Sequence, residues 1–224
     1  RSPETWKNLL KRAFERSHRQ AKVRLRKGGA LWAGYSVVLN PYGGVYPERD
    51  VTTLATMDKI LAYVRRGGVF VNVADVPSFF AYDPTLKRRL TVAPSVFISG
   101  QGFVPVLSLA PLVRRLVLNV VAPTSDPSGV TDTPILTKDY SSLGQAPPKI
   151  RIDRLCKVES NVESVFEPFK IGKEEYGSVV IVNYGRGRFV LSFLFLDGRS
   201  RPENEEIPKF LSDLVTELLA RART

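Results

Sequence analysis

The 224-residue sequence carries 33 lysines and arginines against 22 aspartates and glutamates, a formal net charge of +11 at pH 7. Its one cysteine and one histidine, Cys156 and His18, exclude an internal disulfide and any metal site built from histidine and cysteine clusters. No apolar run is long enough to span a bilayer. A single thiol favours a reducing compartment, so we expect a cytoplasmic protein. Because the chain starts at Arg1 and its only methionine is Met57, we expect it to be part of a longer protein or a processed one.

The N-terminal segment is strongly basic and has the pattern of a helix over residues 3–20. Its apolar face would consist of Trp6, Leu9, Leu10, Ala13 and Phe14. Its cations, and those just after it, are Lys7, Lys11, Arg12, Arg16, Arg19, Lys22, Arg24, Arg26 and Lys27. One interpretation is a helix docked on a sheet with a solvated basic face. The other is a surface for nucleic acid or an acidic protein, with Lys11, Arg12, Arg16 and Arg19 as contacts and Arg186 and Arg188 as helpers.

Residues 35–83 form the unit around which we expect the fold to be built. The apolar runs at residues 37–39 and 69–73 predict two strands covered on both faces. Between them, apolar residues at three- and four-residue steps predict a helix. We expect Thr52 or Thr53 to cap its start and Gly67-Gly68 to end it. Two strands joined by such a helix are typically parallel.

The loops that follow these two strands hold the candidate ligand site. Ligands of open parallel sheets gather at the carboxyl ends of strands, and both loops lie at such ends. The candidates are Asn40, Tyr42, Gly43, Gly44, Asp75 and Ser78. Asparagine and serine can hydrogen-bond a polar ligand, tyrosine can stack on a ring, and the glycine pair can bring backbone amides to an anion. Alternatively, the pair only makes a tight turn and the aromatic side chains only pack the strand ends.

The remainder of the chain predicts further strands and one terminal helix. Residues 90–99 are rich in strand formers, Gly100-Gln101-Gly102 is a turn, and residues 103–121 fit either a helix or a strand. Residues 122–149 hold most of the prolines and glycines and predict a long loop, a lid or an insertion. Strands are expected over residues 150–155, 165–171, 178–183 and 188–196, with a hairpin turn at 184–187. A helix is expected over 203–221.

Three stretches resemble the class I glutamine amidotransferase-like superfamily, a flavodoxin-like group that includes trehalose-utilisation-type and β-galactosidase trimerisation domains. They are VVLNPYGGVYPE at residues 37–48, ILAYVRRGGVFVNVAD at 60–75 and VVIVNYGRGRFVLSFLFLD at 179–197. The resemblance implies one α/β domain over residues 1–224. It also implies an open, mostly parallel sheet with helices on both faces and an antiparallel C-terminal extension.

The catalytic residues of that superfamily are missing from the matching positions. Its enzymes place a nucleophilic cysteine in the turn after the second strand, where this chain has Val73-Ala74-Asp75-Val76. No histidine follows His18, so amidotransferase or peptidase chemistry of that type is not expected. We interpret Cys156 as a buried structural thiol.

Three functions remain open on the sequence. The first is a non-catalytic module that senses a small polar ligand or binds other domains or subunits of a larger assembly, with no cofactor and no metal. The second is nucleic-acid or nucleotide binding through the basic N-terminal segment. The third is a hydrolase that pairs Asp75 with Glu48, Asp50 or Asp83 as acid and base.

Overall fold

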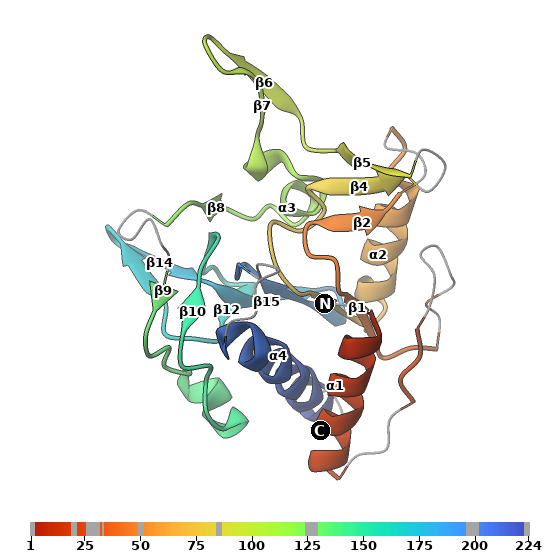
Figure 1. Ribbon diagram of the computed structural model, residues 1–224, viewed down its shortest axis with the longest axis vertical. Coiled ribbons are helices and arrows are strands. Elements are labelled where there is room, and N and C mark those ends of the chain that lie inside the picture. The colour runs from red at the N-terminus through yellow and green to blue at the C-terminus, as the bar shows by residue number, and fades with distance from the viewer. Residues whose placement is uncertain are drawn as a thin grey trace.

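The computed structural model describes residues 3–18, 22–25, 32, 34–48, 52–83, 87–123, 130–195 and 202–221. Its centre is a five-stranded sheet in the order β1-β3-β16-β15-β12, with helices on both faces (Figure 1). These strands are β1 (Val37–Asn40), β3 (Val69–Asn72), β12 (Val162–Ser164), β15 (Val179–Tyr184) and β16 (Gly187–Ser192). The α/β class expected from the sequence is therefore confirmed.

The central sheet is mixed rather than mostly parallel. Strand β3 pairs in parallel with β1 on one side and with β16 on the other. Strand β15 is antiparallel to β16, and β12 is antiparallel to β15. The tight turn between β15 and β16 explains the change of direction, because a two-residue connection can join only antiparallel strands.

The predicted strand–helix–strand unit is confirmed. Val37 lies opposite Val69 and Asn40 opposite Asn72 in a parallel register, and helix α2 (Ala55–Arg65) connects the two strands. The expected threonine cap is wrong, because the helix begins one residue after Leu54, which takes a left-handed conformation and makes no side-chain cap. At the other end Gly67 has φ +112°, so the expected glycine termination is confirmed.

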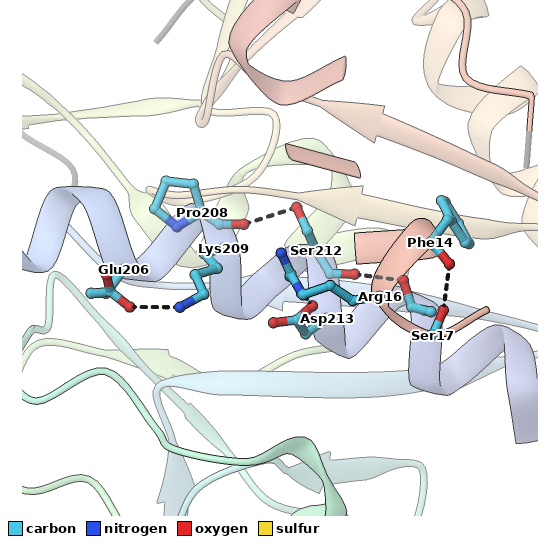
Figure 2. A network of polar contacts seen from close by, with 9 residues as sticks. Phe14, Arg16, Ser17, Glu206, Pro208, Lys209, Ser212 and Asp213 are labelled. Carbon is cyan, nitrogen blue, oxygen red and sulfur yellow. Dashed lines mark hydrogen bonds and ion pairs between the residues drawn. The ribbon is translucent and has the colours of Figure 1, made fainter. Parts of the chain in front are cut away.

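Helices α1 (Pro3–Arg16) and α4 (Pro202–Arg221) pack against one face of the central sheet and against each other. The side chains that α1 buries are Trp6, Leu10, Ala13 and Phe14, so the expected docking of this helix is confirmed. Within α4, Ser212 Oγ donates to the carbonyl of Pro208, and Thr216 Oγ1 donates to that of Ser212 (Figure 2). None of the helices in the described part of the chain has the length and apolarity that a membrane crossing requires.

The other face of the sheet is covered by α2 and the short helix α3 (Pro111–Arg115). The end of α2 lies against the turn that joins β15 to β16. A Cβ on Gly187 would lie 2.1 Å from the carbonyl oxygen of Val64, and one on Gly68 would lie 2.2 Å from the Tyr63 ring. Glycine at position 187 therefore lets helix and turn approach each other closely, and glycine at position 68 leaves room for the Tyr63 ring.

Smaller sheets surround this core. Strands β2 (Val45–Pro47), β4 (Phe80–Asp83) and β5 (Arg88–Thr91) form one, and β6 (Ser95–Ile98) with β7 (Gly102–Pro105) forms a hairpin. Strands β13 (Phe169–Ile171), β14 (Glu174–Gly177), β11 (Leu155–Lys157) and β8 (Val120–Val121) form a third, and β9 (Val130–Thr131) pairs with β10 (Ile150–Arg151). The 3-10 helices are η1 (Leu107–Leu109) and η2 (Lys138–Leu143).

Several sequence expectations need correction at this level. The loop after β1 contains strand β2. Residues 165–171 are not one strand: β13 begins only at Phe169, directly after Pro168, which has no N–H to donate to a strand pair. The ambiguous stretch 103–121 contains strand, 3-10 helix and α-helix in turn. Within the described part of the stretch 122–149, η2 packs on α4 and Tyr140 joins the core.

Candidate functional site

Asn40 and Asn72 end the parallel strands β1 and β3, and their side-chain amides hydrogen-bond each other. Asn40 Nδ2 donates to Asn72 Oδ1 at 3.0 Å, to the Gly43 carbonyl at 2.9 Å and to the Val45 carbonyl at 3.0 Å. Asn72 Nδ2 donates to the carbonyl of Ala74 at 2.7 Å. Both amides thus hold together the loops that follow the strands. Sequence reasoning missed Asn72, although the matching strand endings VVLN and VFVN were a usable signal.

Gly43 and Gly44 lie directly against the turn that follows β3. Gly43 has φ +63°, and a Cβ there would lie 2.6 Å from Asp75 Oδ2. A Cβ on Gly44 would lie 2.9 Å from the carbonyl oxygen of Val76. The two glycines are required for this close packing of two loops, which matches the alternative interpretation of a tight turn.

Asp75 occupies the turn after β3 with φ +59°, a left-handed conformation uncommon for residues other than glycine. Its Oδ2 accepts a hydrogen bond from the Gly44 amide at 3.4 Å. Part of the side chain is exposed, yet desolvation by surrounding protein atoms raises the pKa of the carboxyl group above its ordinary value. Strained backbone at such a turn is a feature from which a functional role can be inferred.

The structure brings three further charged residues to Asp75 from distant parts of the sequence. The negative charge of Asp153 also raises the pKa of Asp75, whereas Arg154 and Arg89 lower it, as does the Gly44 amide. Arg154 Nη1 donates to Asp153 Oδ1 at 3.1 Å, and the amides of both residues donate to the carbonyl of Phe193, just after β16. Sequence reasoning missed this pair, because its position depends on β16 lying beside β3.

The other candidates at this edge differ in environment. Tyr42 is 57% exposed, and Ser78 is buried with φ +61°. Glu48, offered above as a carboxylate partner for Asp75, is 3% exposed and accepts hydrogen bonds from Thr56 N at 2.7 Å and Thr56 Oγ1 at 3.2 Å. It therefore supplies the anionic cap at the start of α2. Asp50 lies outside the described residues.

The chain's thiol and imidazole lie apart from this edge. Cys156 is fully buried in β11, and burial together with the charge of Glu159 raises the pKa of its thiol to about 12. His18 is exposed just after α1. Across the described ranges, no three histidine, cysteine or acidic residues are grouped so as to hold a metal ion.

The basic candidates fall into two separate places. Lys11, Arg12 and Arg16 are exposed on α1, and Arg16 Nη2 pairs with Asp213 Oδ1 at 2.5 Å (Figure 2). Arg19 lies outside the described residues. Arg188 lies opposite Val69, at the start of β3, so it and Arg186 are at the opposite end of the parallel strands from Asn40.

No protein-family model matches the chain, and no curated protein matches it in sequence. Among solved structures, a cold-adapted β-galactosidase from Rahnella sp. matches with a TM-score of 0.53 at 15% identity, over 94% of this chain and 26% of the enzyme. Gan42B, a GH42 β-galactosidase of G. stearothermophilus, matches with a TM-score of 0.50 at 13% identity, over 94% of this chain and 25% of the enzyme. The chain thus spans about a quarter of the length of these enzymes.

A looser likeness is to a protein from Parabacteroides merdae described as ThuA-like, with a TM-score of 0.39, 15% identity and coverage of 92% of this chain and 82% of that one. At these identities the likenesses show the fold alone. The α/β fold that the sequence resemblance implied is one that this chain shares with part of GH42 β-galactosidases.

Proposed function

We propose that this chain is a non-catalytic, amidotransferase-like domain that acts within a larger protein or assembly, with residues 1–224 as one domain. The observation that supports this most is the turn after β3. In the superfamily that the sequence resembles, this turn carries the reactive cysteine. Here it carries Asp75, whose carboxylate accepts a hydrogen bond from the backbone amide of Gly44.

The surroundings of that turn support the same proposal. The amides of Asn40 and Asn72 are used to connect the loops, Glu48 caps a helix, and the thiol of Cys156 is buried with a raised pKa. None of these groups resembles a prepared nucleophile and base, which would need to lie within hydrogen-bonding distance of each other. The shared fold with a quarter-length part of two β-galactosidases also fits a domain that accompanies others.

The finer part of the proposal is a small polar ligand at Asp75, Tyr42 and Ser78. Asp75 is partly exposed, Tyr42 is half exposed, and the opposite charges of Arg89 and Asp153 lie around the same carboxylate. A polar metabolite with hydroxyl or amino groups fits such a mixed environment. Thermal-shift titration with a metabolite panel tests it: a ligand should raise the melting temperature of the wild type and not that of Tyr42→Ala.

Activity screening tests the non-catalytic part. We expect no amidase, peptidase, esterase or glycosidase turnover above background from the purified chain. Cys156→Ala and Asp75→Asn serve as matched controls, because each removes one conceivable reactive group. Turnover by the wild type that either substitution abolishes would overturn the proposal.

A further inference from the structure

The β6–β7 hairpin projects away from the body of the molecule (Figure 1). Among the described strands, β6 and β7 pair only with each other, so both outer edges of this two-stranded sheet lack a strand partner. All four residues of β6 are exposed. An isolated two-stranded hairpin is marginally stable in water, and open edges invite pairing with another chain.

Both faces of this hairpin are apolar. Phe97 lies opposite Phe103 on one face, with ring centroids 5.5 Å apart, and the two side chains are 68% and 76% exposed. Val96 and Ile98 are exposed on the other face, because successive side chains of a strand alternate. A hairpin that faces only water normally carries polar residues on its solvent side. This pattern indicates a segment that is covered by something else.

The hairpin also lacks charge. No lysine, arginine, aspartate or glutamate occurs between Arg89 and Arg114, although such residues make up 25% of the chain. Charged side chains on edge strands are the usual protection against pairing with a second chain, and this protection is missing. Exposed apolar patches of this kind mark interaction surfaces.

A bilayer is a poor occupant for this surface. The outer N–H and C=O groups of β6 and β7 would lose water in the hydrocarbon region, and open sheet edges do not occur there. A protein strand, in contrast, would satisfy those groups and cover the apolar faces together. An uncharged hairpin can meet an identical one without opposing like charges, and the isologous contact would be self-complementary.

We propose that two copies of this chain associate through their β6–β7 hairpins, with Phe97 and Phe103 at the centre of the contact. This inference rests on the proposed non-catalytic role and names the second copy as the partner. The two phenylalanines expose together about 250 Å² in each copy, since a buried aromatic side chain covers about 150–250 Å². Doubled, this is about half of the roughly 1,000 Å² that a specific interface needs, and the remainder would come from the open strand edges and the segments beside the hairpin.

Salt dependence separates a second copy from other partners. Lys87, Arg88 and Arg89 precede the hairpin and Arg114 and Arg115 follow it, so contact with an acidic protein or an anionic membrane should weaken as salt rises. Self-association through an uncharged hairpin should instead strengthen, because salt screens the repulsion between two copies of net charge +11.

Sedimentation velocity of the purified chain at 50 and 500 mM NaCl, over a concentration series, tests the proposal. We expect a dimer whose dissociation constant falls with salt. We expect a monomer for Phe97→Ser/Phe103→Ser that still unfolds cooperatively, with a melting temperature that no longer rises with protein concentration. Val117→Ser is the matched control, because Val117 is 82% exposed outside the hairpin, and this variant should remain dimeric. A wild-type monomer at all concentrations, or a double variant that stays dimeric, would overturn the inference.

A charge-swap pair adds a readout that misfolding cannot mimic. Phe103→Glu and Phe103→Lys should each be monomeric, and their equimolar mixture should recover association if the hairpins face each other. Absence of recovery would contradict the proposed contact. Binding to vesicles of phosphatidylcholine and phosphatidylglycerol by a monomeric chain would instead identify a membrane as the occupant. A chain that is monomeric but inactive in the activity screen would leave the non-catalytic role intact, whereas turnover would remove that role itself.

Discussion

Arg16 at the end of α1 and Asp213 in α4 form an ion pair, with Nη2 and Oδ1 2.5 Å apart, that joins residues 197 positions apart in sequence (Figure 2). One of the four cations proposed to contact nucleic acid is therefore already paired within the protein. The pair lies beside the contact of α1 with α4 that buries Trp6 and Phe14. It marks this helix as part of the packed structure rather than as a free basic arm.

Removing this pair should cost little stability. The two side chains are 47% and 30% exposed, and exposed ion pairs contribute about 0–1 kcal/mol. We expect Arg16→Gln to lower the free energy of unfolding by less than about 1 kcal/mol in urea denaturation. Trp6→Ala, which removes a buried ring from the same helix, should cost about 3–5 kcal/mol. Equal losses from the two changes would contradict this view of how α1 is held.

Nucleic-acid binding through α1, the alternative function, makes a separate prediction. Lys11 and Arg12 are exposed on the helix. If they contact phosphates, Lys11→Glu/Arg12→Glu should weaken binding to a labelled oligonucleotide and lower the slope of log K against log salt by about 2 in fluorescence anisotropy. Lys170→Glu/Lys173→Glu, exposed in the β13–β14 region, is the control with the same change in net charge. If the two double variants behave alike, α1 has no specific role in binding.

The contact of α2 with the β15–β16 turn predicts an intolerant glycine. In Gly187→Ala the added Cβ would meet the backbone carbonyls of Val64 and Gly68 at 2.1 and 2.2 Å. Because backbone cannot rotate away, we expect a loss of at least about 3 kcal/mol, the upper end of overpacking costs. A Cβ on Gly172 would meet no neighbouring atom, but its φ is +64°. Gly172→Ala should therefore lose only about 1 kcal/mol of stability, from the left-handed backbone. Thermal unfolding of both variants measures the difference.

Asp75 predicts a pH-dependent effect on stability. Its pKa in the folded protein is raised above the ordinary value of 3.8, so the folded state holds the proton more tightly than the unfolded state does. The resulting stabilisation is complete below the ordinary pKa and is lost as pH rises through the raised one. We expect Asp75→Asn to raise the melting temperature at pH 7 and to have less effect at pH 3.5. Asparagine also tolerates the left-handed backbone.

A control and a contrary outcome complete that experiment. Asp139→Asn, at an exposed carboxylate in η2, should show no comparable pH-dependent gain. If Asp75→Asn destabilises the protein more at pH 7 than at pH 3.5, the ionised carboxylate is instead held favourably by Arg89 and Arg154.

Local pattern predicted the elements of this fold better than their arrangement. Apolar periodicity located α1, α2, α4 and the β15–β16 hairpin, because each buries one face or lies between two layers. It did not reveal that β16 pairs with β3, since strand order depends on contacts more than 100 residues apart. The Asp153–Arg154 pair beside Asp75 was out of reach for the same reason. By comparison, the uncharged run between Arg89 and Arg114 is visible in the sequence, and it corresponds to the hairpin that is apolar on both faces.

The position of β16 has a consequence for synthesis of the chain. This strand lies between β3 and β15, so the middle of the sheet stays open until residue 192 has left the ribosome. Until then β3 presents the apolar edge formed by Val69 and Val71 to the surroundings. Non-local pairing of this kind is slow and exposes nascent chains to aggregation. Chaperone protection of the growing polypeptide should therefore matter most before its C-terminal hairpin and α4 emerge.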